Sequence, residues 1–135
     1  MRIPFFGLFA QVLMAAVPAA AEPMGVAVLQ GMDKVTARVS TIRVAVNDTV
    51  RFGTLEITAY RCDKRSPEEL PESAAFLDIR EARVGEAPVE LFRGWMFASS
   101  PALSAMEHPV YDVWVLDCEQ SAAMAPARTP SGKSP

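Results

Sequence analysis

The chain has 135 residues, of which 50% are hydrophobic, and a formal net charge of −3 at pH 7. Its charged residues are interspersed, and the sequence has no stripe of Lys and Arg of the kind that binds nucleic acid. Phosphate-binding glycine loops, dinucleotide fingerprints and C-x-x-C-H haem motifs are also absent, so we expect neither a nucleic-acid partner nor a cofactor.

The N-terminal sequence MRIPFFGLFAQVLMAAVPAAAEP has the pattern of a secretory signal peptide. Arg2 precedes an apolar run from Ile3 to about Val17, and Ala19 and Ala21 provide the small side chains that signal peptidases read. A membrane anchor is the alternative, but a spanning helix needs about 20 apolar residues, and this run is shorter. We therefore expect residues 1–21 to be cleaved off after Ala21, leaving a periplasmic protein without an integral membrane segment.

The mature chain is expected to form one folded domain. Residues 22–120 have the length of a single small domain and carry the regular apolar patterning. Residues 121–135 are rich in Ala, Pro and Ser and have no apolar period, which predicts a disordered tail.

The first half of the domain has the period-two alternation of β-strands. A short apolar segment, Met24 to Gln30, is followed by GMDK, which is typical of a turn. Lys34 to Val46 alternates as a strand, with a phase shift near Ser40 that predicts a bulge or break. After the turn NDTV, whose asparagine and aspartate tolerate left-handed backbone, residues 50–62 read as a second long strand. Gly53 within it indicates a bulge or a close approach.

The second half continues this pattern after a charged loop, Asp63 to Ser73. AAFLDIREAR has residues that also favour a helix, but its alternation and flanking turns favour a third strand. VELFRGWMF and VYDVWVLDC predict two more strands. Between them, Ser100 and Pro101 predict the cap and first position of a short helix that ends before Pro109. The fold class is therefore all-β: a small antiparallel sandwich or barrel with one short helical crossover.

The two cysteines, Cys62 and Cys118, have two interpretations. An exported chain with two cysteines most often forms one disulfide. A bond between Cys62 and Cys118 would close the long loop between them and stabilise the folded protein by about 4 kcal/mol. Two free thiols that bind a metal are the alternative, but two cysteines and one histidine are too few for a closed zinc site without a carboxylate. We therefore favour the disulfide and expect no metal.

Two catalytic arrangements deserve comparison with non-catalytic roles. Ser99 or Ser100 with His108 and Asp112 match the residue types of a hydrolase triad, but no G-x-S-x-G motif surrounds the serines. His108 precedes a proline in a predicted loop, where an exposed histidine is common. Paired acids of a glycosidase would need Glu68, Glu69, Asp112 or Asp117 to face one cleft, and their spacing does not pair them. The interpretation that we favour is a protein without catalysis.

Aromatic residues gather in the last third of the sequence. We expect most of them to lie in the core and one or two to be exposed, because Trp and Tyr are frequent at interface hot spots. The candidate interaction surface consists of Trp95, Trp114, Tyr111 and His108.

Three segments carry a resemblance to a known family: VAVLQGMDKVTARVS, VRFGTLEITAYRC and ELFRGWMFASSPALSAMEHPVYDVWVLDC. They resemble the DUF2155 family, exported bacterial proteins of unknown function that are mostly alphaproteobacterial, over about Gly25 to Cys118. The resemblance implies export, a small domain and a paired Cys62 and Cys118, and it supplies no catalytic residue.

From these observations we expect a periplasmic binding or structural module that engages a protein or another envelope component. Genes of the family often lie beside that of a small accessory subunit of respiratory NADH:quinone oxidoreductase. The resemblance therefore implies one alternative, an accessory subunit on the periplasmic side of that membrane complex. A small hydrolase that uses Ser99 or Ser100 with His108 is a remote alternative.

Overall fold

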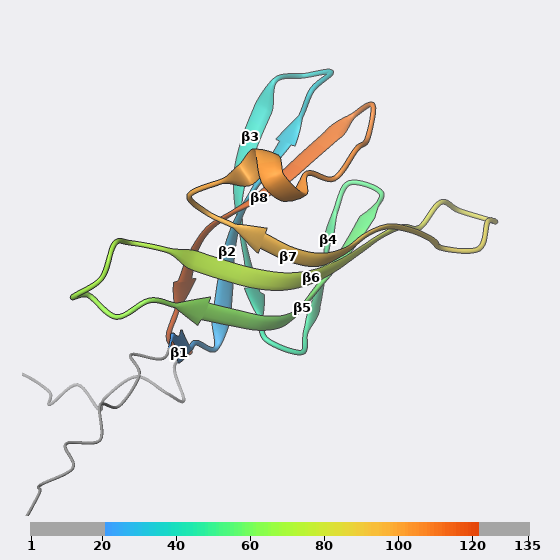
Figure 1. Ribbon diagram of the computed structural model, residues 1–135. Coiled ribbons are helices and arrows are strands. Elements are labelled where there is room, and N and C mark those ends of the chain that lie inside the picture. The colour runs from blue at the N-terminus through green and yellow to red at the C-terminus, as the bar shows by residue number, and fades with distance from the viewer. Residues whose placement is uncertain (1–20, 122–135) are drawn as a thin grey trace, which may run out of the picture.

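The computed structural model describes residues 21–121. The positions expected to form most of the signal peptide, 1–20, and nearly all of the tail, 122–135, lie outside the described residues. The described chain is built from strands and one short 3-10 helix (Figure 1): β1 (Glu22–Pro23), β2 (Val26–Asp33), β3 (Arg38–Ala45), β4 (Thr49–Phe52), β5 (Leu55–Lys64), β6 (Ser73–Glu81), β7 (Val89–Phe97), η1 (Pro101–Ser104) and β8 (Tyr111–Glu119). Over residues 21–121, no helix has the length and apolar character needed to cross a membrane.

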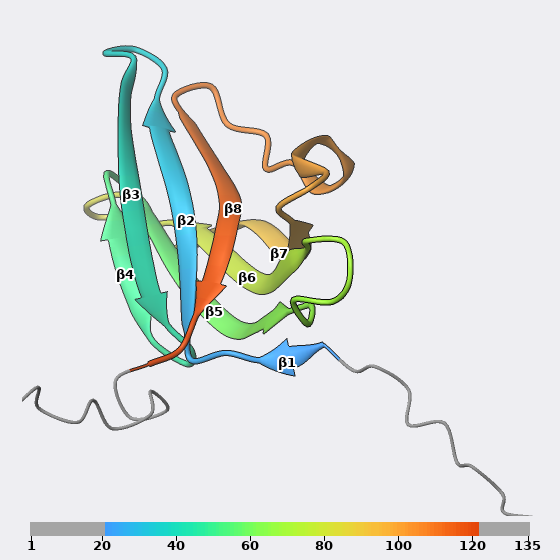
Figure 2. The same cartoon turned by 90° about the vertical axis from the view of Figure 1, so that its left-hand side faces the viewer.

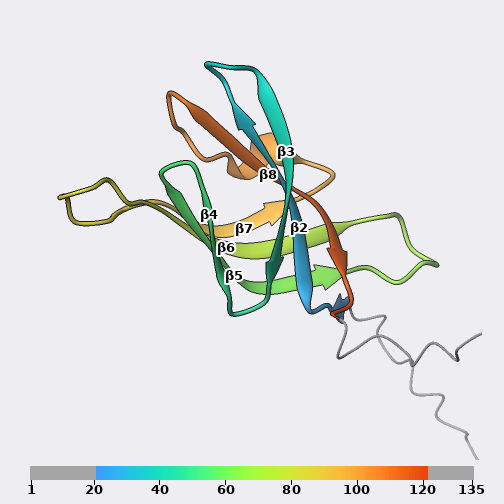
Figure 3. The same ribbon diagram turned by 180° about the vertical axis from the view of Figure 1, so that it is seen from behind.

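The strands form two antiparallel sheets, which confirms the all-β prediction. In the five-stranded sheet the order is β1-β5-β6-β7. Strand β4 pairs with the same edge of β5 as β1 does, but further along the strand. In the three-stranded sheet the order is β3-β2-β8 (Figure 2). The strands of the two sheets run in clearly different directions, as the front and back views show (Figures 1 and 3). The described part of the chain is thus a two-sheet sandwich.

The core lies between the inner faces of the two sheets. Alternate residues of β5 and β6 point inward, as the period of two requires, and they meet inward residues of β2, β3 and β8. The largest fully buried aliphatic side chains are Leu29, Leu55, Ile57, Leu77, Ile79, Val44 and Val115.

The structure corrects the predicted start of the second segment. Lys34–Ala37 form a turn, in which the Asp33 carboxylate accepts hydrogen bonds from the amides of Val35 and Thr36 at 2.9 and 3.2 Å. Gly31, expected in the turn, lies inside β2. A Cβ atom there would come within 2.8 Å of Ile42 and Phe52, so this glycine serves the packing between the sheets.

The predicted strand over residues 50–62 is two strands joined by a tight turn at Gly53 and Thr54. Gly53 has φ +59°, and a Cβ atom at this position would collide with the Tyr111 hydroxyl. The close approach expected at this glycine is confirmed, whereas the continuous strand is wrong. The left-handed backbone expected before β4 is found at Asn47, with φ +69°.

The later elements follow the sequence closely. β6 is a strand and not a helix, and β7 has the predicted bounds. The crossover forms as η1, but the Ser100 side chain makes no cap hydrogen bond, so this part of the prediction is wrong. The turn is closed by the Leu103 amide, which donates to the Ser100 carbonyl at 3.1 Å.

Candidate functional site

The two cysteines join the two sheets. Cys62 near the end of β5 is bonded to Cys118 near the end of β8, with their Cα atoms 5.6 Å apart, and both are buried. This separation is in the usual range for a disulfide. The predicted disulfide is confirmed, and the bonded sulfurs leave no thiolate that could bind a metal.

His108 is buried, which corrects the expectation of an exposed ring on an interaction surface. Its Nδ1 accepts hydrogen bonds from the amides of Val110 and Tyr111 at 3.0 and 3.1 Å, so Nδ1 carries no proton. Its Nε2 donates to the carboxylate of Glu81, which is also bound by Arg83. The hydrogen bond from His108, followed by that from Arg83, lowers the pKa of Glu81 although burial opposes the change. His108 therefore fastens the segment before β8 to the end of β6.

The hydrolase triad considered above does not form among the described residues. Ser99 donates its hydroxyl to Glu72 and its amide lies 3.2 Å from the same carboxylate. Asp112 forms an ion pair with Lys34 at 3.1 Å. Because both ring nitrogens of His108 are already engaged, the imidazole has no free nitrogen with which to accept a proton from serine.

Tyr111 is partly buried and lies next to His108. Its ring lies 5.2 Å from that of His108 and 5.4 Å from that of Phe52, and it packs against the core. The reason is the turn at Gly53, whose missing side chain leaves room for the tyrosine hydroxyl.

The two tryptophans lie on different sheets. Trp114 lies in β8, opposite Gln30 of β2, and lines a small groove of about 360 Å³ between β8 and the η1 crossover, with Met32 and Met106. Trp95 lies in β7 and is paired with Phe76 of β6. The four residues proposed as one surface are therefore divided among three places.

Around Trp95, the outer face of the five-stranded sheet carries a cluster that we call the aromatic–arginine face. Phe76 meets Trp95 edge to face at 5.6 Å, and Tyr60 lies 6.2 Å from Phe76. The Arg61 guanidinium lies over Trp95 at 5.8 Å, and that of Arg93 lies over Tyr60 at 5.7 Å. None of these side chains belongs to the core cluster or packs against it.

A β-bulge explains why neighbouring residues share this face. The β5–β6 register passes from Ala59–Leu77 to Arg61–Phe76, so Tyr60 is the extra residue. Before the bulge Ala59 points into the core, and after it Cys62 does so, which leaves Tyr60 and Arg61 both outward. Tyr60, Phe76 and the two arginines were not among the residues predicted from the sequence to form an interaction surface. One signal was available: Tyr60 in AYRC and Phe76 in AAFLDIR each adjoin positions that face the core, so an outward-facing aromatic residue could have been expected on each of two adjacent strands.

Carboxylates lie beneath the arginines. Asp78 is only 3% exposed and binds both Arg80 and Arg93 at 3.2 Å. Asp63 is 17% exposed and binds Arg61 at 3.0 Å, whereas the Arg61 and Arg93 side chains are 62% and 51% exposed. Solvent therefore meets guanidinium groups and ring edges on this face, and the anions that hold the guanidinium groups lie below.

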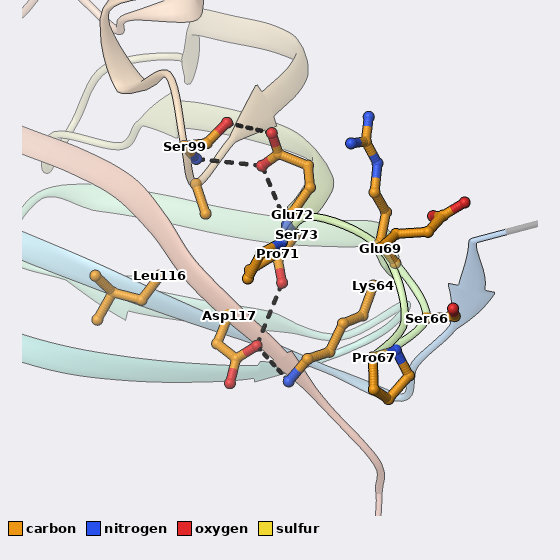
Figure 4. A pocket seen from close by; sticks show the side chains of 12 residues that line it. Lys64, Ser66, Pro67, Glu69, Pro71, Glu72, Ser73, Ser99, Leu116 and Asp117 are labelled. Carbon is orange, nitrogen blue, oxygen red and sulfur yellow. Dashed lines mark hydrogen bonds and ion pairs between the residues drawn. The ribbon is translucent and has the colours of Figure 1, made fainter.

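A cavity of about 590 Å³ lies against the loop between β5 and β6, and its lining includes Lys64 and Asp117, which are close in sequence to the two cysteines (Figure 4). Lys64 binds Asp117 at 3.0 Å, and the Ser73 hydroxyl donates to the same carboxylate at 3.2 Å. Burial is the strongest influence on Asp117 and acts to raise its pKa, but the bonds from Lys64, the Cys118 amide and Ser73 together lower it. The polar groups that the dashed lines join are thus satisfied by one another.

Another hollow, of about 330 Å³, lies between this cavity and Trp95 of the aromatic–arginine face and shares lining residues with the cavity. It is lined by Trp95, Phe97 and Ala74, together with Asp63 and Ala21. Arg65 and Glu72 line both cavities. Apolar rings and charged groups are therefore adjacent at one end of the face. Among residues 21–121, no group of three or more His, Cys, Asp or Glu side chains could hold a metal ion.

Comparison with known proteins gives a family and no function. A curated relative, an uncharacterized protein of Rickettsia prowazekii (strain Madrid E), is 32% identical over 87 residues, which span 64% of this chain and 56% of that protein. No solved structure matches the chain. The model of the family described as "Uncharacterized protein conserved in bacteria (DUF2155)" matches residues 27–118, from β2 to the second cysteine of the disulfide. The chain therefore belongs to the DUF2155 family.

Proposed function

We propose that the protein is an exported binding module without catalysis, which engages a protein partner in the periplasm through the aromatic–arginine face. One observation carries the proposal: an aromatic cluster, with arginines lying over two of its rings, is found outside the core on the outer side of the five-stranded sheet. The core between the sheets is complete without these rings, so packing within the fold does not account for them.

The composition and order of this face suit protein recognition. Trp, Tyr and Arg are the residues most enriched among interface hot spots. The contacts of Trp95 with Phe76 and Arg61 restrict its side chain before a partner arrives. A restricted side chain loses less conformational entropy on binding, which favours affinity.

Export is supported by two independent features. The N-terminal sequence has the charge, apolar run and small residues of a cleavable signal. The buried disulfide belongs to a type of crosslink that persists in oxidising compartments such as the periplasm.

Site-specific photo-crosslinking in cells tests this proposal. A photoreactive amino acid replaces Tyr60, whose side chain is 39% exposed at the centre of the face, and a matched variant carries it at Leu103 on η1. We expect position 60 to yield one discrete crosslinked protein, and Trp95→Ala in the same chain to abolish it, while Trp114→Ala preserves it. Equal crosslinking from both positions, or a crosslink that survives Trp95→Ala, would contradict the proposal.

The same experiment identifies the partner. Subunits of the respiratory NADH:quinone oxidoreductase in the crosslinked product would support the assignment as an accessory subunit. Melting curves of the Trp95→Ala and Trp114→Ala proteins are the control for folding.

A further inference from the structure

The charged groups of the aromatic–arginine face indicate the chemistry of the partner that it binds. Arg61 and Arg93 are each held from below by a carboxylate that is shielded from solvent, and each lies over an aromatic ring. Asp78 is shared by Arg80 and Arg93, and Arg80 also lies opposite Glu56 and Glu90 of the neighbouring strands. Around the rings the exposed charged groups are therefore the guanidinium groups of Arg61 and Arg93, whereas the Arg80 end of the face also carries acidic side chains.

We propose that the partner presents an acidic segment, in which carboxylates alternate with apolar side chains, to this face. The proposal rests on the proposed function and specifies the chemistry of its partner. Arg61 binds Asp63 through Nη2 and Arg93 binds Asp78 through Nη1, so each guanidinium keeps further N–H groups, and two parallel N–H groups match the two oxygens of a carboxylate. Apolar side chains of the same segment have the adjacent hollow beside Trp95 and Phe97.

Two other anionic partners fit less well. Nucleobases bind such sheets by stacking on open aromatic faces, but here guanidinium groups already lie over Trp95 and Tyr60. Anionic lipid headgroups attract clustered basic residues non-specifically, whereas these arginines are fixed in position by Asp63 and Asp78. Fixed donors next to apolar hollows favour a segment with a defined spacing of acidic and apolar groups.

The test uses two synthetic peptides and the mature protein. One 12-residue peptide contains glutamate, leucine and serine, and in the other glutamine replaces each glutamate. Binding is followed by NMR, through the side-chain Nε–H signals of Arg61 and Arg93 and the indole signal of Trp95. We expect the acidic peptide to shift these signals and to bind at least about ten-fold more tightly than its glutamine counterpart, because hydrogen bonds to charged groups are stronger. Added salt should weaken this binding.

Variants assign the effect to the face. The double variant Arg61→Gln/Arg93→Gln should lose the preference for glutamate, whereas Arg43→Gln, which removes an exposed arginine of the other sheet, should keep it. Melting curves show whether each variant is folded, and single variants replace the double variant if it is not.

Three outcomes would overturn the inference: equal binding of the two peptides, signal shifts centred on Arg43, or binding to phosphatidylglycerol vesicles without binding to the acidic peptide. Each leaves the proposed function standing if position 60 still crosslinks to a protein. Failure of that crosslink removes the proposed function itself.

Discussion

Strand β8 is linked to the five-stranded sheet at both of its ends, by a disulfide at one end and by a hydrogen-bonded histidine at the other. We call these links the covalent fastening and the polar fastening. At its end, Cys118 is bonded covalently to Cys62 of β5. Just before its start, His108 is hydrogen-bonded to Glu81 of β6, and Lys34 donates to the His108 carbonyl at 2.9 Å. The disulfide also restricts the unfolded chain and has no group that titrates, whereas the hydrogen bond between His108 and Glu81 exists only in the folded state and is weakened when the Glu81 carboxylate is protonated.

The disulfide should contribute the larger part of the stability. We expect the double variant Cys62→Ser/Cys118→Ser to lose about 4 kcal/mol of unfolding free energy, because the open chain regains the entropy of a long loop. For a domain of this size that loss corresponds to a fall in melting temperature of roughly 15 °C or more. Thermal denaturation of the oxidised protein and the double variant measures it. An unchanged melting temperature would mean that the polar fastening holds β8 against the five-stranded sheet without the disulfide.

Loss of the histidine should have the next largest effect. His108→Ala leaves the buried Glu81 carboxylate with Arg83 as its remaining partner and leaves two amides without their acceptor, so the melting temperature should fall by several degrees. His108→Gln keeps a donor for Glu81 but not the acceptor for the amides, whereas His108→Asn offers the acceptor on a shorter side chain. Comparing the three variants by denaturation separates the two halves of the fastening. Equal stability of His108→Ala and the parent protein would refute this role.

Tyr111, whose ring lies next to that of His108, links the polar fastening to the turn at Gly53. Gly53→Ala should lower stability by more than the roughly 1 kcal/mol expected for an alanine at positive φ, because the new methyl group must also displace the Tyr111 hydroxyl. Gly85→Ala is the matched control, since Gly85 has φ +80° and open space around it. Urea denaturation of both variants measures the difference. A difference of zero would show that Tyr111 moves away without cost.

The smallest expected effect on stability at neutral pH concerns Glu81, whose contribution changes as the pH falls. Its pKa is lowered in the folded protein from an ordinary value of 4.5, first by the bond from His108. The corresponding stability is therefore fully present above about pH 4.5 and is lost as the pH falls through the folded pKa. Asp117 beside the disulfide, with an ordinary value of 3.8, acts in the same direction at lower pH.

Denaturation between pH 7 and pH 3 tests this. Glu81→Gln should lose stability less steeply below pH 4.5 than the parent protein, whereas Glu68→Gln, which changes an exposed loop carboxylate, should follow the parent curve. Parallel curves for Glu81→Gln and the parent protein would remove Glu81 from the account of acid sensitivity.

The two fastenings also differ in how far the sequence revealed them. Two cysteines in an exported chain allow one intramolecular pair, so Cys62 and Cys118 could be paired in advance. The link between His108 and Glu81 spans 27 residues and depends on where the crossover places the ring, which no local pattern encodes. The period of two likewise predicted most strands, including β7 with its bounds, because alternation follows directly from burial of one face.

The candidate site was only partly predictable for the same reason. Trp95 was predicted as a surface residue, but its neighbours Tyr60 and Phe76 come from other strands and depend on the register and on a bulge. Gly31 and Gly53 were interpreted as a turn and a strand interior, and they have the opposite roles. Each is placed by a contact with a ring distant in sequence, Phe52 and Tyr111 respectively.

The position of Ala21 has a practical consequence for anyone who prepares this protein. Ala21, the last residue of the expected signal peptide, lines the hollow next to Trp95 and Phe97, and the next two residues pair with β5, so any residue that precedes Glu22 emerges at this hollow. An affinity tag fused ahead of Glu22 would lie over the hollow at one end of the aromatic–arginine face and would obstruct the binding of a partner there.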